Sequence, residues 1–413
     1  MTNKFNKYWC DIHNKNITFL NSILLILTPL AIFNFYNYVN APSFLKIISY
    51  IVFPIVFIYC FKTILYSHFY LSKLYKLLLF STFMSMIMAY IYHSQSFELS
   101  YRICAFGFLG YIYYFLLHQI KPSVKTVEIL IVIFLLIYIF IWLYALSQAP
   151  HLVFGQSGFE DAKSVDFDRG VFRIKIVGDC FLPLSIFYFI NKYISTRKLI
   201  FLIFSILIFF IVILHVTRQL IFFSFLLSIL YLMKKRKIMR ILIVFTLILI
   251  IFSPNILKFS QNSILGLLIN TTSNQINDNI ENQDVRLLCY KHIFLDFPNN
   301  PLTILFGNCM EHSNSLYGDY IRRTMSSKGL YPSDVGYAAI YLYNGLLGFY
   351  IFMSIFIKSL TAKIDPDYYY IKLLFIYILI INFTSIPLIG AAIAICMCSY
   401  IIDKKVLKQP RKI

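Results

Sequence analysis

Charged side chains are rare in the long apolar stretches of this sequence, and the few that occur there are candidates for chemistry. Arg218 stands inside the apolar stretch of residues 199–233, beside His215 and Thr217. A guanidinium group in apolar surroundings is costly and commonly faces a cavity or a partner. It also matches phosphate oxygens in a bidentate way. Arg218 is therefore a candidate for binding an anionic group, and the alternative is an arginine that reaches to lipid headgroups.

A second basic group precedes that stretch. Arg169 and Arg173 are four residues apart, and so are Lys175 and Asp179. This spacing places each pair on one face of a helix. On a helix, the three basic residues would form a cationic strip for the anionic headgroup of a lipid substrate. The alternative is that Lys175 and Asp179 neutralise each other and the arginines anchor the helix at the membrane surface.

A third candidate lies in the polar region that follows. Residues 283–297 place three apolar side chains and one histidine at the spacing of one helical face, namely Val285, Leu288, His292 and Leu295. This pattern predicts an amphipathic helix at a membrane surface. Arg286 lies near the start of that helix. It either points toward the same site as Arg218 or is simply solvated.

Two further side chains are candidates for moving a proton. Asp334 comes immediately before the apolar stretch 335–357, where a carboxylate can act as a general base or can cap the helix that follows. His312 is the second candidate for the base, because an imidazole titrates near neutral pH. The eight histidines show no metal-ligand spacing, and no phosphate-binding glycine motif occurs. We therefore expect neither a metal nor a cofactor.

The composition defines the elements that must position these residues. The 413-residue chain is 59% apolar and 13% charged, with a mean hydropathy of +0.73. Soluble domains carry about 45–50% apolar and about 25% charged residues. A water-soluble core cannot hide this much apolar surface, so the sequence predicts an all-α, polytopic integral membrane protein. We expect residues 1–413 to form a single integral membrane domain.

About twelve apolar stretches are long enough to cross a bilayer as helices. They are residues 17–36, 44–61, 74–92, 103–120, 127–146, 171–190, 199–216, 220–233, 241–257, 335–357, 370–386 and 388–402. Residues 199–233 count as two stretches, because basic clusters flank both ends and a single crossing would put one cluster outside. The chain should therefore turn near Arg218.

The charges predict the orientation of these spans. With the N-terminus and the C-terminus inside, 24 of the 37 basic residues and 5 of the 18 acidic residues face the cytoplasm. Basic residues concentrate on the cytoplasmic side of membrane proteins, so the prediction is N-in and C-in. Two long loops then face outward, at residues 147–170 and 258–333. The second loop contains Cys289 and Cys309, and the sequence does not decide whether they form a disulfide.

Several of these features occur together in a known superfamily. A span-turn-span contains Thr217 and Arg218. The large outer loop contains Arg286, followed by the run Pro-Leu-Thr-Ile-Leu-Phe-Gly at residues 301–307. A late span begins at Ser-Asp-Val-Gly, residues 333–336, with Gly345 and Gly348 downstream. In this order and topology, the chain resembles the superfamily of O-antigen polymerases and O-antigen ligases, and the polymerases more closely. The ligases carry a histidine where this chain has Asp334.

The resemblance implies a metal-independent glycosyltransferase that polymerises repeat units of a polysaccharide on undecaprenyl diphosphate. Arg218 and Arg286 would stabilise the leaving diphosphate, and Asp334 or His312 would serve as the base. The expected location is the bacterial inner (plasma) membrane. The expected partners are lipid-linked oligosaccharides, the bilayer, and a chain-length regulator and a flippase of the same pathway. An O-antigen ligase that uses lipid A core, or a flippase for lipid-linked oligosaccharides, remains the alternative.

Overall fold

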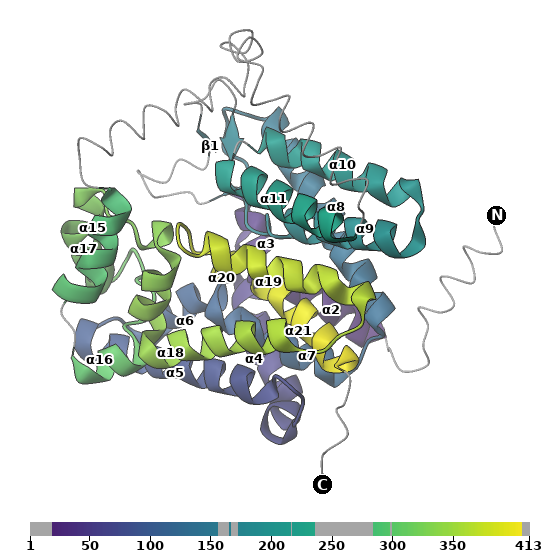
Figure 1. Ribbon diagram of the computed structural model, residues 1–413. Coiled ribbons are helices and arrows are strands. Elements are labelled where there is room, and N and C mark those ends of the chain that lie inside the picture. The colour runs from purple at the N-terminus through teal and green to yellow at the C-terminus, as the bar shows by residue number, and fades with distance from the viewer. Residues whose placement is uncertain are drawn as a thin grey trace, which may run out of the picture.

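The structure is a computed structural model, which describes residues 19–155, 165–166, 172–215, 217–235, 284–297 and 300–406. Its regular elements are almost entirely helical (Figure 1). Before residue 236 the helices are α2 (Phe19–Ile32), α3 (Asn34–Asn37), α4 (Ser43–Tyr66), α5 (Ser72–His93), α6 (Phe97–Ala105), η1 (Phe108–Ile112), α7 (Tyr113–Ile120), α8 (Val124–Ser147), α9 (Phe181–Thr196), α10 (Leu199–Leu214) and α11 (Arg218–Lys235). After residue 283 they are α15 (Val285–Lys291), η2 (His292–Asp296), α16 (Pro301–Phe306), α17 (Leu316–Thr324), η3 (Ser326–Lys328), η4 (Pro332–Asp334), α18 (Gly336–Thr361), η5 (Pro366–Tyr368), α19 (Tyr369–Ile381), α20 (Pro387–Gly390) and α21 (Ala392–Lys405).

Four of these helices are long and apolar enough to cross a membrane: α4, α5, α8 and α18. A fifth crossing results if α6 and the helical segment Phe108–Ile120, which meet at an angle of 64°, form one bent span. Large apolar side chains on these helices face outward, as Ile58 and Phe140 do with 75% and 74% of their surface exposed. The chain is therefore an α-helical, membrane-embedded protein, as the composition predicts. The predicted span 241–257 lies outside the described residues.

The helices form two groups that a third element joins. The long helices α5 and α18 pack side by side, and α16 contacts both of them (Figure 1). The second group contains α8, α9, α10 and α11. Helix α19 packs against α18 on one side and against α9 and α11 on the other.

The sixth predicted span, residues 171–190, begins ten residues later than expected. Its first part is not helical, because Arg173–Ile174 forms strand β2, which pairs antiparallel with β1 (Val165–Asp166). A turn with Gly178 at φ +98° follows, a conformation that L side chains rarely adopt. The helix α9 starts only at Phe181. The prediction that Lys175 and Asp179 share a helical face is therefore wrong.

Helix α18 is broken at Gly345, where the backbone has φ 64° and ψ −170°. The break leaves the carbonyl groups of Leu342 and Tyr343 without their usual helical partners. The backbone N–H groups of Asn308 and Cys309 donate to these two carbonyls, at 2.8 and 3.0 Å. The segment that follows α16 is therefore hydrogen-bonded to the backbone of α18 at the break.

A buried carboxylate ties three helices together at the other end of the bundle. Asp403 of α21 accepts a hydrogen bond from the Leu71 N–H at 3.1 Å and another from the Tyr114 hydroxyl. Its Oδ2 lies 3.0 Å from Nε2 of His118, and only 1% of either side chain is exposed. The ring of Phe69 stacks on His118 at 3.8 Å and covers the group. Asp403 thus joins α21 to α7 and to the start of α5.

Replacing Asp403 by alanine should lower the free energy of unfolding by about 2–3 kcal/mol, because it leaves buried donors without an acceptor. Asp403→Asn keeps an acceptor oxygen, and we expect it to cost about half as much. Thermal unfolding of the detergent-purified variants measures the difference. Equal stability of the alanine variant and the wild type would show that the contacts of Asp403 contribute nothing.

Candidate functional site

Arg218 lies at the turn of an apolar helical hairpin, as predicted. Helix α10 ends at Leu214 and α11 begins at Arg218. The rings of Phe209 and Phe225 lie 5.4 Å apart, which shows that the two helices run back along each other. The side chain of Arg218 is partly buried, and its Nε and Nη2 atoms are shielded from solvent. The hairpin therefore holds a partly buried guanidinium group at its turn.

Polar groups of α8, of the end of α10 and of the turn before α9 lie at this hairpin. The buried His215 stacks on Trp142 at 5.3 Å, and its Nε2 hydrogen-bonds the Tyr138 hydroxyl at 2.5 Å. The carboxyl group of Asp179 lies close enough to Tyr138 to interact electrostatically. Burial raises the pKa of Asp179 to about 6. Asp179 thus faces the protein interior near the hairpin.

The structure describes less of the other predicted basic residues, Arg169, Arg173 and Lys175, than of Arg218. The side chain of Lys175 is exposed, and Arg173 belongs to strand β2. Arg169 lies outside the described residues. Their predicted role as a cationic strip for a lipid carrier therefore stays a prediction, without the helix on which it was based.

The predicted amphipathic helix exists, but it buries a different face. Its first turns form α15, where the Asp284 side chain accepts from the Arg286 N–H at 2.8 Å, and a π-turn follows at His292–Asp296. Val285 and Leu295, which the pattern assigns to the buried face, are 50% and 73% exposed. The buried residues are instead Cys289, Ile293 and Phe297. The π-turn widens the helix and changes which residues share a face. The side chain of Arg286 is exposed.

Gln95 positions the segment that leads from α16 to α17. This buried side chain donates to the Met310 carbonyl at 2.9 Å and to Ser100 Oγ at 3.0 Å. It accepts from the His312 N–H at 2.9 Å and from the Ser315 hydroxyl at 2.8 Å. One side chain of the α5–α6 connection therefore holds the backbone on both sides of residue 311.

Five polar and aromatic side chains meet at this point, and we call them the loop cluster: His93, Asn308, Glu311, Tyr317 and Tyr343. His93, the last residue of α5, hydrogen-bonds Asn308 Oδ1 at 2.8 Å and stacks on the Tyr317 ring at 4.2 Å. The Tyr343 side chain lies beside the carboxyl group of Glu311. Glu311 is the charged group that acts most strongly on both tyrosines.

Glu311 carries the unusual carboxyl group of the loop cluster. Burial raises its pKa to about 7. Its Oε2 atom is buried, and so is the Tyr317 hydroxyl, and neither has a hydrogen-bond partner among the described residues. Burial and the charge of Glu311 raise the pKa of Tyr317, so this phenol stays protonated and is a donor. The loop cluster therefore presents a proton acceptor and a proton donor that the protein itself does not use.

Of the two predicted bases, His312 adjoins this cluster, next to Glu311, and Asp334 lies just before α18. His312 accepts the Asn314 N–H on Nδ1 at 3.2 Å, so its neutral ring carries the proton on Nε2 and is a donor. Burial and the Arg102 charge lower its pKa, which keeps the ring neutral. Asp334 is exposed at the end of η4, and Val335 occupies the N-cap position of α18. Burial of Cys289, together with the charge of Asp334, raises the pKa of this thiol to about 12. Asp334 therefore lies near α15.

The disulfide between Cys289 and Cys309, which the sequence left open, is not formed. Cys289 and Cys309 are both buried free thiols. The Sγ atom of Cys309 contacts Sγ of Cys104 in α6 at 3.3 Å. This contact joins the loop segment to the bent span formed by α6 and α7.

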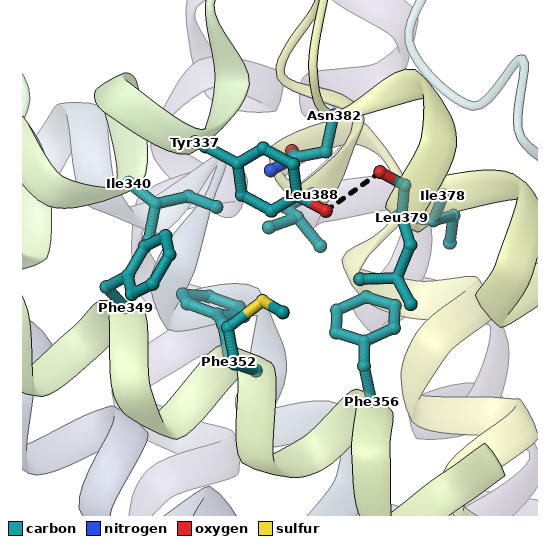
Figure 2. A pocket seen from close by; sticks show the side chains of 10 residues that line it. Tyr337, Ile340, Phe349, Phe352, Phe356, Ile378, Leu379, Asn382 and Leu388 are labelled. Atoms are coloured by element: carbon teal, nitrogen blue, oxygen red, sulfur yellow. Dashed lines mark hydrogen bonds between the residues drawn. The ribbon is translucent and has the colours of Figure 1, made fainter.

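One small cavity lies between α18 and α19. Figure 2 shows its apolar lining, with the Tyr337 hydroxyl donating to the Leu379 carbonyl at 2.8 Å. Its volume is about 10 Å³, which accommodates one water molecule. A sugar or a diphosphate does not fit there, so the candidate site is not this cavity.

The structure brings some of the predicted residues together and keeps others apart. His312 neighbours the loop cluster, whereas α15, which carries Arg286, is drawn beside α17 and well away from α11 (Figure 1). The sequence reasoning missed Glu311, Tyr317 and His93. The only signal in the sequence was that Glu311 stands next to His312. The contacts that build the cluster join residues about 215 positions apart along the chain, such as His93 and Asn308, and local patterns do not reveal them. In the part of the chain that the structure describes, no three His, Cys, Asp or Glu side chains are grouped as metal ligands.

The fold and these sites define an α-helical membrane protein with polar groups buried at the Arg218 turn and in the loop cluster. No protein-family model, no curated protein and no solved structure matches the chain. The function must therefore be argued from these residues and their geometry.

Proposed function

We propose that this protein is a polysaccharide polymerase of the O-antigen or capsule type. It would transfer a growing glycan from undecaprenyl diphosphate to a repeat unit on the same carrier. The reaction would occur at the outer face of the bacterial inner membrane. Twelve crossings with both termini inside would place the loop cluster, Arg218 and Arg286 on that outer side. The excess of basic residues in the cytoplasmic segments supports this orientation.

The observation that carries the proposal is the position of Arg218. A guanidinium group with buried nitrogen atoms begins α11, at the turn of a hairpin whose two helices are largely apolar. A lipid diphosphate places its anionic group at the end of an apolar chain, so the hairpin offers matching surroundings for both parts. In such a medium a fixed cation acts far more strongly on a developing negative charge than it does in water. Arg218 would therefore stabilise the diphosphate as it leaves. The role of Arg286 at the same diphosphate stays a prediction, because α15 lies away from α11 (Figure 1).

A ladder assay tests this function directly. Protein purified in detergent is incubated with undecaprenyl-diphosphate repeat units, with a metal chelator present, and the products are separated on a gel. A ladder of glycans that differ by one repeat unit supports a metal-independent polymerase. Protein that binds the carrier lipid but forms no ladder contradicts the proposal. In that case transfer to lipid A core and translocation of the lipid-linked oligosaccharide are measured next, because they report a ligase and a flippase.

The same assay examines Asp334. Asparagine cannot take a proton but keeps the size and polarity of the carboxylate. If Asp334 were the general base, Asp334→Asn and Asp334→Ala would both reduce the rate, by about 10²–10⁴-fold. Because Asp334 is exposed, we expect less than a tenfold decrease in either variant. Loss of the ladder in Asp334→Asn at unchanged carrier binding would instead establish Asp334 as the base.

A further inference from the structure

The loop cluster contains an ionisable group that the proposed role of the arginines does not use. Glu311 sits between two backbone positions, Met310 and His312, that Gln95 holds. Its carboxyl group lies beside Tyr343, which belongs to the broken part of α18. The backbone that carries this carboxylate is therefore held in place, as a group that must meet a substrate atom requires.

The buried polar atoms of this cluster point to a ligand with hydroxyl groups. The Oε2 atom of Glu311 accepts hydrogen bonds, and the Tyr317 hydroxyl donates them, and both lack a partner among the residues described. A buried polar atom without a partner costs about 1–3 kcal/mol, so proteins normally satisfy such atoms. Glu311 as a whole keeps part of its surface exposed, whereas Tyr317 is 1% exposed, so a ligand reaches both unpaired atoms when the cluster opens at Glu311. A sugar carries adjacent hydroxyl groups that can donate to one atom and accept from the other.

We propose that Glu311 is the catalytic carboxylate of this protein, and that it accepts the proton of the acceptor sugar hydroxyl while Tyr317 donates a hydrogen bond to the same sugar. This inference rests on the proposed glycan polymerase function. The acceptor oxygen forms a bond to the anomeric carbon of the donor sugar, and the bond from that carbon to the diphosphate oxygen breaks. The electron pair of the broken bond stays on the diphosphate. The hydroxyl proton passes to Glu311 and then to water.

The surroundings of Glu311 suit a base that works near neutral pH. Its pKa of about 7 arises from burial, so about half of the carboxyl groups are ionised at that pH. A base is most effective when its pKa lies near the working pH. Titratable or charged groups from five helices and from its own segment act on Glu311 or on its neighbours. They are His93 from α5, Arg102 and Cys104 from α6, Cys289 from α15, Tyr317 and Tyr320 from α17, Tyr343 from α18, and Cys309 and His312 from its own segment.

The first test measures the ladder assay of the full chain against pH. For the wild type, the rate should rise between about pH 6 and 8 and level off above, because the base must be ionised. Glu311→Gln should reduce the rate by about 10²–10⁴-fold and remove this rise, while binding of the carrier lipid stays unchanged. Asp319→Asn is the matched control, since this carboxylate on α17 is 45% exposed and pairs with Arg322 at 3.4 Å. The control should keep both the rate and its pH dependence.

The second test has a readout besides activity. Folding raises the pKa of the Glu311 carboxyl group from 4.5 to about 7. The folded protein therefore loses stability as the pH rises through this range. The melting temperature of the wild type should therefore fall relative to that of Glu311→Gln between pH 5 and pH 8. The melting temperature of Asp319→Asn should follow that of the wild type. A difference between wild type and Glu311→Gln that does not change with pH would overturn the inference.

The two proposals can fail separately. A wild-type protein that forms no ladder contradicts the polymerase function and the catalytic role together. A wild-type ladder, with Glu311→Gln within twofold of its rate, overturns the role of Glu311 and leaves the polymerase function standing. A tenfold or larger loss that keeps the wild-type pH dependence also overturns the proton-accepting role, because it assigns Glu311 to positioning only.

Discussion

The Arg218→Ala variant is expected to lose about 10²–10³-fold of the polymerisation rate, which is the usual effect of removing one preorganised donor from a developing negative charge. The loss should appear mainly in the turnover rate, because the charge on the diphosphate grows in the transition state. The rate at which ladder bands appear, at saturating lipid-linked substrate, measures it.

Two variants make this result specific. Arg218→Lys keeps the positive charge but not the planar fork, so its rate should lie between those of alanine and wild type. Arg323→Ala removes an exposed arginine from α17 and should leave the rate unchanged. Full-length polymer from Arg218→Ala, at wild-type protein level, would refute the leaving-group role of this residue.

The Gly345→Ala substitution is expected to lower the free energy of unfolding by about 3–5 kcal/mol, the range of severe single substitutions. A Cβ atom at Gly345 would lie 2.5 Å from the Gly307 nitrogen, and one at Gly307 would lie 2.5 Å from the Asn344 nitrogen. Both glycines also have positive φ, which alone costs an alanine about 1–2 kcal/mol. The side chain cannot be accommodated without separating the loop segment from the break in α18.

Thermal unfolding in detergent measures this effect, with Gly390→Ala as the matched control. A Cβ atom at Gly390 meets nothing within 4 Å, and the backbone there does not have positive φ. We expect the melting temperature of the control to equal that of the wild type. If Gly345→Ala were as stable as Gly390→Ala, the close backbone contact between α16 and α18 would be disproved.

The position of the break has a consequence for the loop cluster. Tyr343 precedes Gly345 by two residues, and its carbonyl group pairs with the Cys309 N–H. Movement of the break would therefore move Tyr343 and, through it, the carboxyl group of Glu311. We expect Gly345→Ala to reduce the polymerisation rate even at temperatures where the variant remains folded.

Part of the candidate site could be predicted from the sequence because its causes are local. The basic residues at both ends of residues 199–233 require the chain to turn inside this stretch, and α10 and α11 meet there at Arg218. The long apolar runs likewise determine α4, α5, α8 and α18, since a helix satisfies its own backbone in lipid whatever its neighbours are.

Only the tertiary structure decided the rest. The start of α9 at Phe181 depends on a strand pair between Val165–Asp166 and Arg173–Ile174, and apolar patterning cannot distinguish such a strand from the first turns of a span. Glu311 becomes a buried carboxyl group only because Gln95, some 215 residues earlier, holds its segment against the break in α18. Burial, pKa and unmet hydrogen bonds are properties of neighbours brought together by folding. The sequence alone determined the membrane class and the turn at Arg218, and the packing of distant segments selected the carboxylate.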